Sequence, residues 1–136
     1  SCGKERVPVF QKLKVAILAT GDELVPVADK PVGDKVRVSN SYSLCAALQE
    51  IHHTPADLGI AKDDKPGLQE KINDALEMGV DVLITTGSVS VGKYDYLKQI
   101  FKEEGVKEIF WRVNIKPGKP IYFGVYENSQ KKTLAV

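Results

Sequence analysis

The sequence predicts an α/β domain built around a mostly parallel sheet. Apolar runs rich in β-branched residues alternate along the chain with segments whose apolar residues recur at helical spacing. Two of the runs, residues 13–19 (LKVAILA) and 82–86 (VLITT), are apolar over nearly their whole length. That pattern is typical of strands covered on both faces. Strand–helix–strand repeats form right-handed units with parallel strands, so the alternation predicts the fold class.

The composition limits what the protein is expected to contact. The chain has 136 residues, enough for one domain with a hydrophobic core. Its formal net charge is +1, so no strong field draws it to nucleic acid or to an anionic membrane. No apolar run approaches the length of a membrane span. Two cysteines do not make a disulfide framework, and a reducing cytoplasm is therefore expected.

The first half of the chain supplies a strand, a loop and a helix. After the strand at 13–19, two prolines and a glycine in residues 26–35 predict a loop, and residues 36–38 predict a short strand. Residues 39–41 (SNS) carry side chains that cap helices. The apolar residues that follow at one-face helical spacing are Leu44, Ala47, Leu48 and Ile51.

The second half continues the alternation. The remaining strands are expected at residues 56–61, 82–86, 106–115, 121–126 and 132–136, the last two as a hairpin. Two helices separate the first three of these strands, the second of them starting at Lys93. Their apolar stripes are Leu68, Ile72, Ala75 and Leu76 in the first helix and Leu97, Ile100 and Phe101 in the second. Gly79 is expected to end the first of these helices.

Polar residues gather where the predicted parallel strands end. In such a sheet, ligands bind beyond the carboxyl ends of the strands. Asp22 and Glu23 follow the first strand, and Asp63 and Asp64 follow the second. Residues 87–92 (GSVSVG) follow the third and precede a helix. Glycines and a helix N-terminus suit a phosphate. A tight turn without a ligand is the alternative, because the glycine spacing matches neither the dinucleotide fingerprint nor the P-loop.

Carboxylates beside a phosphate loop indicate a hard cation such as Mg²⁺. The candidates are Glu23, Asp64 and Asp95. Acids in such loops also serve as helix caps or are simply solvated, and this alternative stays open. Lys116 and Lys119 in the turn KPGKP either meet an anionic ligand or are solvated.

Five segments together resemble one family. They are VAILATGDELV (15–25), the pair Ser39 and Asn40, DLGIAKDD (57–64), TTGSVSVGKYDYLK (85–98) and IKPGKPIYFG (115–124). In this order they look like the molybdopterin molybdenumtransferases, the bacterial MoeA type also seen in the carboxy-terminal part of gephyrin. The resemblance implies the central, molybdopterin-binding domain of such an enzyme. It also implies a three-layer α/β/α sandwich of the MogA-like kind.

The resemblance implies a function in molybdenum cofactor biosynthesis. Members of the family bind adenylylated molybdopterin, insert molybdate and release AMP with Mg²⁺, and other domains complete their site across a homodimer. The implied catalytic and metal-binding residues are Glu23, Asp64 and Asp95. The implied substrate-binding residues are Thr20, Gly21, Asp22, Asn40, Thr86, Gly87, Ser88, Ser90, Gly92, Lys116, Gly118 and Lys119. Ser88 is a departure, because the family usually has a second glycine there.

The same comparison suggests how the chain is divided. Residues 1–11 are expected to be a linker from a preceding domain, and residues 12–136 the molybdopterin-binding domain, truncated at its C-terminus. Two other functions are compatible with this fold. One is a molybdopterin adenylyltransferase, against which the motif at 20–24 (TGDEL) argues. The other is a molybdopterin-binding domain without turnover of its own.

Overall fold

The computed structural model describes residues 3–87, 94–128 and 132–136, which form a domain around one six-stranded sheet. In spatial order the strands are β4 (Thr54–Ala61), β1 (Lys14–Thr20), β5 (Val82–Gly87), β8 (Lys132–Ala135), β7 (Tyr122–Glu127) and β6 (Lys107–Trp111). The pairs β4–β1, β1–β5 and β5–β8 are parallel, and only the two pairs made by β7 are antiparallel. The predicted mostly parallel sheet is confirmed. The predicted hairpin is confirmed as the antiparallel pair of β7 and β8.

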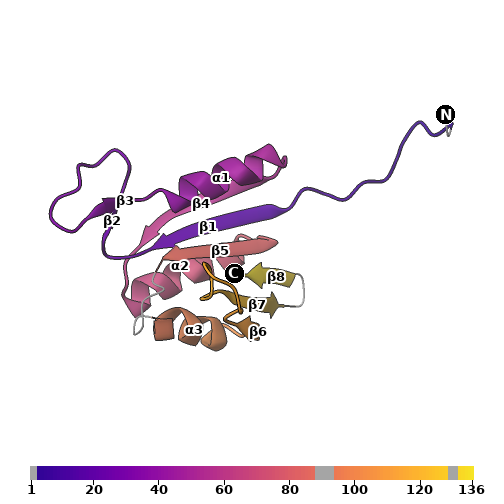
Figure 1. The fold of residues 1–136 in the computed structure, drawn as a ribbon. Coiled ribbons are helices and arrows are strands. Elements are labelled where there is room, and N and C mark those ends of the chain that lie inside the picture. The colour runs from indigo at the N-terminus through magenta and orange to yellow at the C-terminus, as the bar shows by residue number, and fades with distance from the viewer. Residues whose placement is uncertain (1–2, 88–93, 129–131) are drawn as a thin grey trace.

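Three helices flank the sheet. Helix α1 (Asn40–Glu50) covers one face, and α2 (Lys65–Glu77) and α3 (Tyr94–Glu103) lie on the other (Figure 1). From β1 the chain moves outward to β4 and then back across β1 to β5. The connection from β1 to β4 and the connection from β4 to β5 run in opposite directions along the sheet. Because both are right-handed, their helices lie on opposite faces, and the domain has three layers: helix, sheet and helices. None of the helices in the described part of the chain has the length and apolar character needed to cross a bilayer.

The hydrophobic core lies between the sheet and the pair α2 and α3. The predicted stripes of both helices are buried there: Leu68, Ile72, Ala75, Leu76, Leu97, Ile100 and Phe101. Ala16, Leu18 and Leu83 face them from the two central strands. The ring of Phe101 also stacks on Tyr122 at 5.2 Å between centroids, which ties α3 to β7.

Helix α1 is packed less deeply than its apolar stripe predicts. Leu44 and Leu48 are half-buried, whereas Ile51 is 61% exposed. The helix ends at Glu50, so Ile51 is its C-cap residue and lies beyond the turn that faces the sheet. Cys45 is half-buried, and burial, assisted by the nearby carboxylate of Asp57, raises the pKa of its thiol.

Two strand predictions are corrected. The strand expected over residues 106–115 ends at Trp111, because Arg112 adopts a left-handed backbone (φ +64°) that a strand cannot continue through. Residues 24–25 form β2 (Leu24–Val25), which pairs in parallel with β3 (Val36–Arg37). These two short strands close the loop at 26–35 into an arm that projects from the carboxyl end of the sheet (Figure 1).

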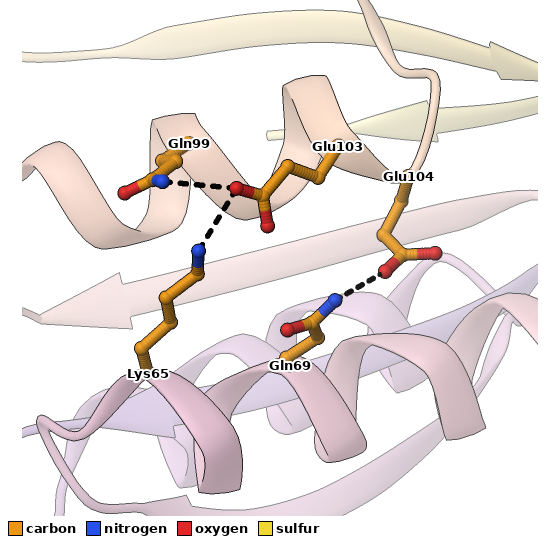
Figure 2. A network of polar contacts seen from close by, with 5 residues as sticks. All are labelled: Lys65, Gln69, Gln99, Glu103 and Glu104. Carbon is orange, nitrogen blue, oxygen red and sulfur yellow. Dashed lines mark hydrogen bonds and ion pairs between the residues drawn. The ribbon is translucent and has the colours of Figure 1, made fainter.

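Polar side chains connect α2 to α3 on the solvent side (Figure 2). Lys65 Nζ lies 2.8 Å from Glu103 Oε1, and Gln99 Nε2 donates to the same oxygen at 2.9 Å. Gln69 Nε2 donates to Glu104 Oε1 at 2.8 Å. The hydrogen bond from Lys65 is the main reason that the pKa of the Glu103 carboxyl lies below its ordinary value.

Replacing Ile72 by alanine should destabilise the domain strongly. Its side chain is fully buried, so Ile72→Ala removes apolar contacts and leaves a cavity, at a cost of about 2–5 kcal/mol in the free energy of unfolding. The matched control is Ile51→Ala at an exposed position, expected to cost less than about 0.5 kcal/mol. Urea denaturation of both variants checks this, and equal losses would contradict the assignment of the core.

The contact between Lys65 and Glu103 should stabilise the domain only where the carboxyl is charged. Because the folded pKa of Glu103 is lowered, its contribution is present above the ordinary carboxyl pKa and is lost as the pH falls through the folded value. Glu103→Gln should therefore lower the urea midpoint at pH 7 and leave it unchanged in acid. Glu5→Gln, in the exposed N-terminal segment, serves as the control.

Candidate functional site

A crevice opens where the order of the strands reverses. The chain leaves β1 toward β4 on one side and returns to β5 on the other, so the helices that follow β1 and β5 diverge to opposite faces. Ligands of doubly wound sheets bind at such a point, beyond the carboxyl ends of the strands. A cavity of about 190 Å³ lies there. We call it the switch-point cavity. The predicted site residues that line it are Thr20, Glu23, Asn40, Thr86 and Gly87.

The floor of the switch-point cavity is a close contact between two backbones. Gly87, the last residue of β5, is paired with Thr20, the last residue of β1. Gly87 has φ +104°, and a Cβ atom there would lie 1.9 Å from the carbonyl oxygen of Thr20. The hydroxyl of Thr20 is buried and donates to the carbonyl oxygen of Thr86 at 3.3 Å. Only glycine fits at position 87, so this residue adds no side chain to the cavity.

The turn after β1 forms one wall. Leu24 N donates to the carbonyl oxygen of Gly21 at 3.2 Å, and Gly21 N donates to the carbonyl oxygen of Ala61 at 3.2 Å. The carboxylate of Glu23 folds back over Gly21, where an added Cβ would meet its Oε2 at 2.6 Å. This turn places Glu23 among the residues that line the switch-point cavity.

The opposite wall is positively polarised. Ser39 is the N-cap residue of α1 but makes no side-chain capping bond, so its hydroxyl does not satisfy the first N–H groups of the helix. Arg37, at the end of β3, also lines the cavity, and its Nε donates to the carbonyl oxygen of Val27 at 3.0 Å. The sequence interpretation did not include Arg37 or Ser39 as site residues. An arginine two residues before a helix N-cap was the signal that could have found them, since both features favour anions.

The predicted carboxylates do not all meet. Asp64 is the N-cap residue of α2, and its Oδ1 accepts a hydrogen bond from Gly67 N at 2.8 Å. It therefore has the capping role that was the alternative for acids in these loops. Asp22 and Asp63 face each other instead: Asp63 N donates to Asp22 Oδ1 at 3.0 Å, and Asp22 N donates to Asp63 Oδ2 at 3.3 Å.

A divalent cation would need the substrate to complete its ligand set. Among residues 3–87, 94–128 and 132–136, no three His, Cys, Asp or Glu side chains are grouped so that they could hold a metal ion. Mg²⁺ commonly takes only one or two carboxylates and fills its other positions with water and substrate phosphate. Glu23 lines the switch-point cavity and carries one carboxylate, so it fits this smaller ligand set.

Other predicted residues lie elsewhere. Ser88, Ser90 and Gly92 are outside the described residues, as is the side chain of Asp95, whose backbone belongs to the first turn of α3. Lys116, Gly118 and Lys119 form an exposed turn and are not among the described residues that line the switch-point cavity. The next residue, Pro120, lines a second cavity of about 330 Å³ together with Thr86 and Gly87. The turn thus leads back to the end of β5.

These features define a class: a doubly wound α/β domain with a polar crevice at its switch point. A family model described as a probable molybdopterin binding domain matches residues 16–136, and the chain belongs to that family.

Two curated relatives match nearly the whole chain. It is 38% identical over 130 residues to the molybdopterin molybdenumtransferase of Synechocystis sp., covering 96% of this chain and 33% of the relative. It is 36% identical over 129 residues to the enzyme of the same name from Haemophilus influenzae, covering 95% of this chain and 31% of the relative. The chain therefore spans about a third of the length of these curated relatives.

Solved structures agree on the fold. The molybdopterin biosynthesis MoeA protein of Pyrococcus horikosii superposes with a TM-score of 0.77 at 29% identity, covering 94% of this chain and 30% of that one. The tungsten cofactor synthesizing protein MoaB of Pyrococcus furiosus superposes with a TM-score of 0.61 at 16% identity, covering 93% and 81%. The second match covers most of the MoaB chain, so the layered fold also occurs in proteins much shorter than MoeA.

The contact between Gly87 and Thr20 predicts that alanine destabilises the domain far more at position 87 than at position 33. Gly87→Ala should cost about 4 kcal/mol or more, in the extreme range of single substitutions, because β1 and β5 must separate to admit the methyl group. Gly33→Ala is the control: Gly33 also has a positive φ (+66°) but open space around it, so only the backbone strain of about 1–2 kcal/mol applies. Thermal unfolding of both variants measures the difference, and similar losses would refute the close contact.

Proposed function

We propose that this chain is the substrate-binding domain of a molybdopterin molybdenumtransferase, which inserts molybdate into adenylylated molybdopterin and releases AMP. The observation that carries the proposal is the switch-point cavity, which combines main-chain donors, an arginine and a carboxylate. It occurs in a chain that is 38% identical, over 96% of its length, to a protein of that name. The function belongs to molybdenum cofactor biosynthesis.

The wall formed by α1 and Arg37 would hold the phosphate end of the pterin. The first N–H groups of α1 carry the positive end of the helix dipole, and Arg37 adds a full charge beside them. Asn40 and Thr86 offer further polar groups at the same cavity. The close contact with Thr20 allows only glycine at position 87, so a phosphate could approach the main chain of this residue. The predicted roles of Ser88, Ser90 and Gly92 extend this arrangement.

Glu23 would act on the other side of the same anion. A bound Mg²⁺ offsets the repulsion between a carboxylate and a phosphate and polarises the phosphoryl oxygen. Glu23 is the residue we assign to hold it, with Asp64 and Asp95 as the further predicted ligands. Asp64 would keep its hydrogen bond from Gly67 N on Oδ1 and coordinate through Oδ2. Attack of a water molecule on one phosphorus of the P–O–P linkage would break the linkage, release AMP and leave a phosphate on the pterin.

The whole protein would supply what this chain lacks. The relatives are about three times as long, and we propose that further domains and a second copy complete the site in a cytoplasmic homodimer. The chain by itself would bind the pterin without turnover. The turn with Lys116 and Lys119, exposed here, would meet an anionic group only in that larger assembly.

The test is an assay of the full-length protein with adenylylated molybdopterin, molybdate and Mg²⁺. AMP release is expected, and Glu23→Gln should reduce its rate at least about tenfold, the effect of disturbing a metal ligand set. Glu70→Gln, on the exposed side of α2, is the matched control and should retain full activity.

Other outcomes identify other functions. Consumption of ATP with formation of the adenylylated pterin would make the protein an adenylyltransferase. Tight pterin binding without AMP release by the full-length protein would make it a binding protein. Full activity of Glu23→Gln would show that our assignment of the carboxylate is wrong.

A further inference from the structure

The first strand of the sheet begins with two backbone N–H groups that donate to side chains. Leu13 N donates to Nδ1 of His53 at 3.2 Å, and Lys14 N donates to Oδ2 of Asp81 at 2.7 Å. His53 is the residue directly before β4, and Asp81 is the residue directly before β5, which are the two strands that flank β1. The two side chains therefore extend the hydrogen bonding of β1 beyond its amino end on both sides.

The two acceptors differ in their response to pH. A carboxylate is an acceptor whenever it is ionised, whereas Nδ1 of histidine accepts a hydrogen bond only when it carries no proton. Protonation of the His53 ring would place an N–H donor opposite the N–H donor of Leu13, and their hydrogen bond would be lost. The hydrogen bond between Lys14 and Asp81 does not depend on this proton. One of the two anchors of β1 is therefore sensitive to the charge of a single imidazole.

The backbone that carries the imidazole is fixed by the end of α1. His53 N donates to the carbonyl oxygen of Leu48 at 2.9 Å, and His52 N donates to the carbonyl oxygen of Gln49 at 2.9 Å. His52 has a left-handed backbone with φ +65°. These are the hydrogen bonds and the conformation of a Schellman motif, which commonly ends helices. His53 is thus held by its main chain whether or not its ring is protonated.

The segment on the other side of the hydrogen bond has little to hold it. Residues 3–14 are exposed at every position. Even the apolar side chains of Val9 and Phe10 are 85% and 103% exposed, so they contribute no burial that could fix the segment. When the bond between Leu13 and His53 breaks, the segment is therefore the part that can move.

Few other groups can change charge at this end of the sheet. The charged or titratable side chains on the start of β1, the end of α1 and the turn before β5 are Lys12, Lys14, Glu50, His52 and Asp81. Carboxylates and ammonium groups ordinarily keep their charge between about pH 5 and about pH 8, whereas histidine ordinarily changes its charge there. His52 is thus the neighbour whose titration an experiment must separate from that of His53.

We propose that His53 is a pH-sensitive latch for the segment that leads into β1. With a neutral ring, the segment is fixed from Leu13 onward. With a protonated ring, the anchor of β1 moves back to Lys14, and residues 3–13 can leave the domain in other directions. In a protein as long as the relatives, the latch would govern the direction of the chain that enters this domain. The inference is independent of the proposed function, because the latch lies at the amino ends of the strands.

Exchange of individual amide protons, measured by NMR on the 136-residue chain, tests the latch. Each rate is divided by the rate of an unstructured peptide at the same pH. Protection of the Leu13 amide should fall about fivefold between about pH 8 and about pH 5, as expected for the loss of one hydrogen bond. Protection of the Lys14 amide, which is bound to Asp81, should stay the same and serves as the internal control.

Three variants assign the effect to one side chain. His53→Ala should leave Leu13 poorly protected at both pH values. His53→Asn places an amide oxygen near the position of Nδ1, so Leu13 should stay protected at both. His52→Asn, which suits the left-handed backbone, should keep the pH dependence of the original protein. Thermal unfolding shows whether each variant is folded. Equal protection of Leu13 at both pH values in the original protein, or a pH dependence that persists in His53→Ala or His53→Asn, would overturn the inference.

Discussion

The approach of two backbones at Thr20 and Gly87 is the constraint on which the rest of the site depends. The two central strands are paired in parallel up to their last residues, and no Cβ atom fits between Gly87 and the carbonyl oxygen of Thr20. A side chain there would separate β1 from β5 and displace everything that follows each strand. Because the contact holds, the turn at Gly21 to Glu23 and the start of α1 converge on one small crevice. The pairing that orders the sheet therefore also positions the ligand groups.

The turn after β1 gains importance from its position between two cavities. Glu23 lines the switch-point cavity together with Arg37 and the start of α1. Gly21 and Asp22, in the same turn, line a cavity of about 750 Å³ that also has Lys35 and Lys62 in its lining. The turn therefore borders two chemically different surroundings.

Much of the fold follows from local sequence, whereas the site depends on distant residues. The runs at 13–19 and 82–86 both predict their strands, and the run at 13–19 does so best because β1 is buried from Val15 to its end, which favours apolar residues on both faces. The stripe around Ile72 likewise predicts a buried helix face. The short strand at 36–38 was predicted, but its partner β2 was missed because it has only two residues and no periodicity. The cavity of about 750 Å³ beside β4 was missed because Asp22, Tyr42 and Lys62 meet only once the sheet is assembled. Asp64 could be a metal ligand or a helix cap, and residue spacing alone does not distinguish these roles; the structure shows the cap.

The place of β8 in the sheet has a consequence for synthesis of the protein. Among the described strands, β8 alone joins the parallel half of the sheet to the hairpin of β6 and β7, and it is the last of them to leave the ribosome. Until it does, β5 keeps one unpaired edge, and the hairpin that precedes β8 has no strand of the parallel half to pair with. Exposed strand edges of this kind invite pairing with other chains. Completion of the sheet therefore depends on a single late strand insertion, and the open edge of β5 is exposed to aggregation until it occurs.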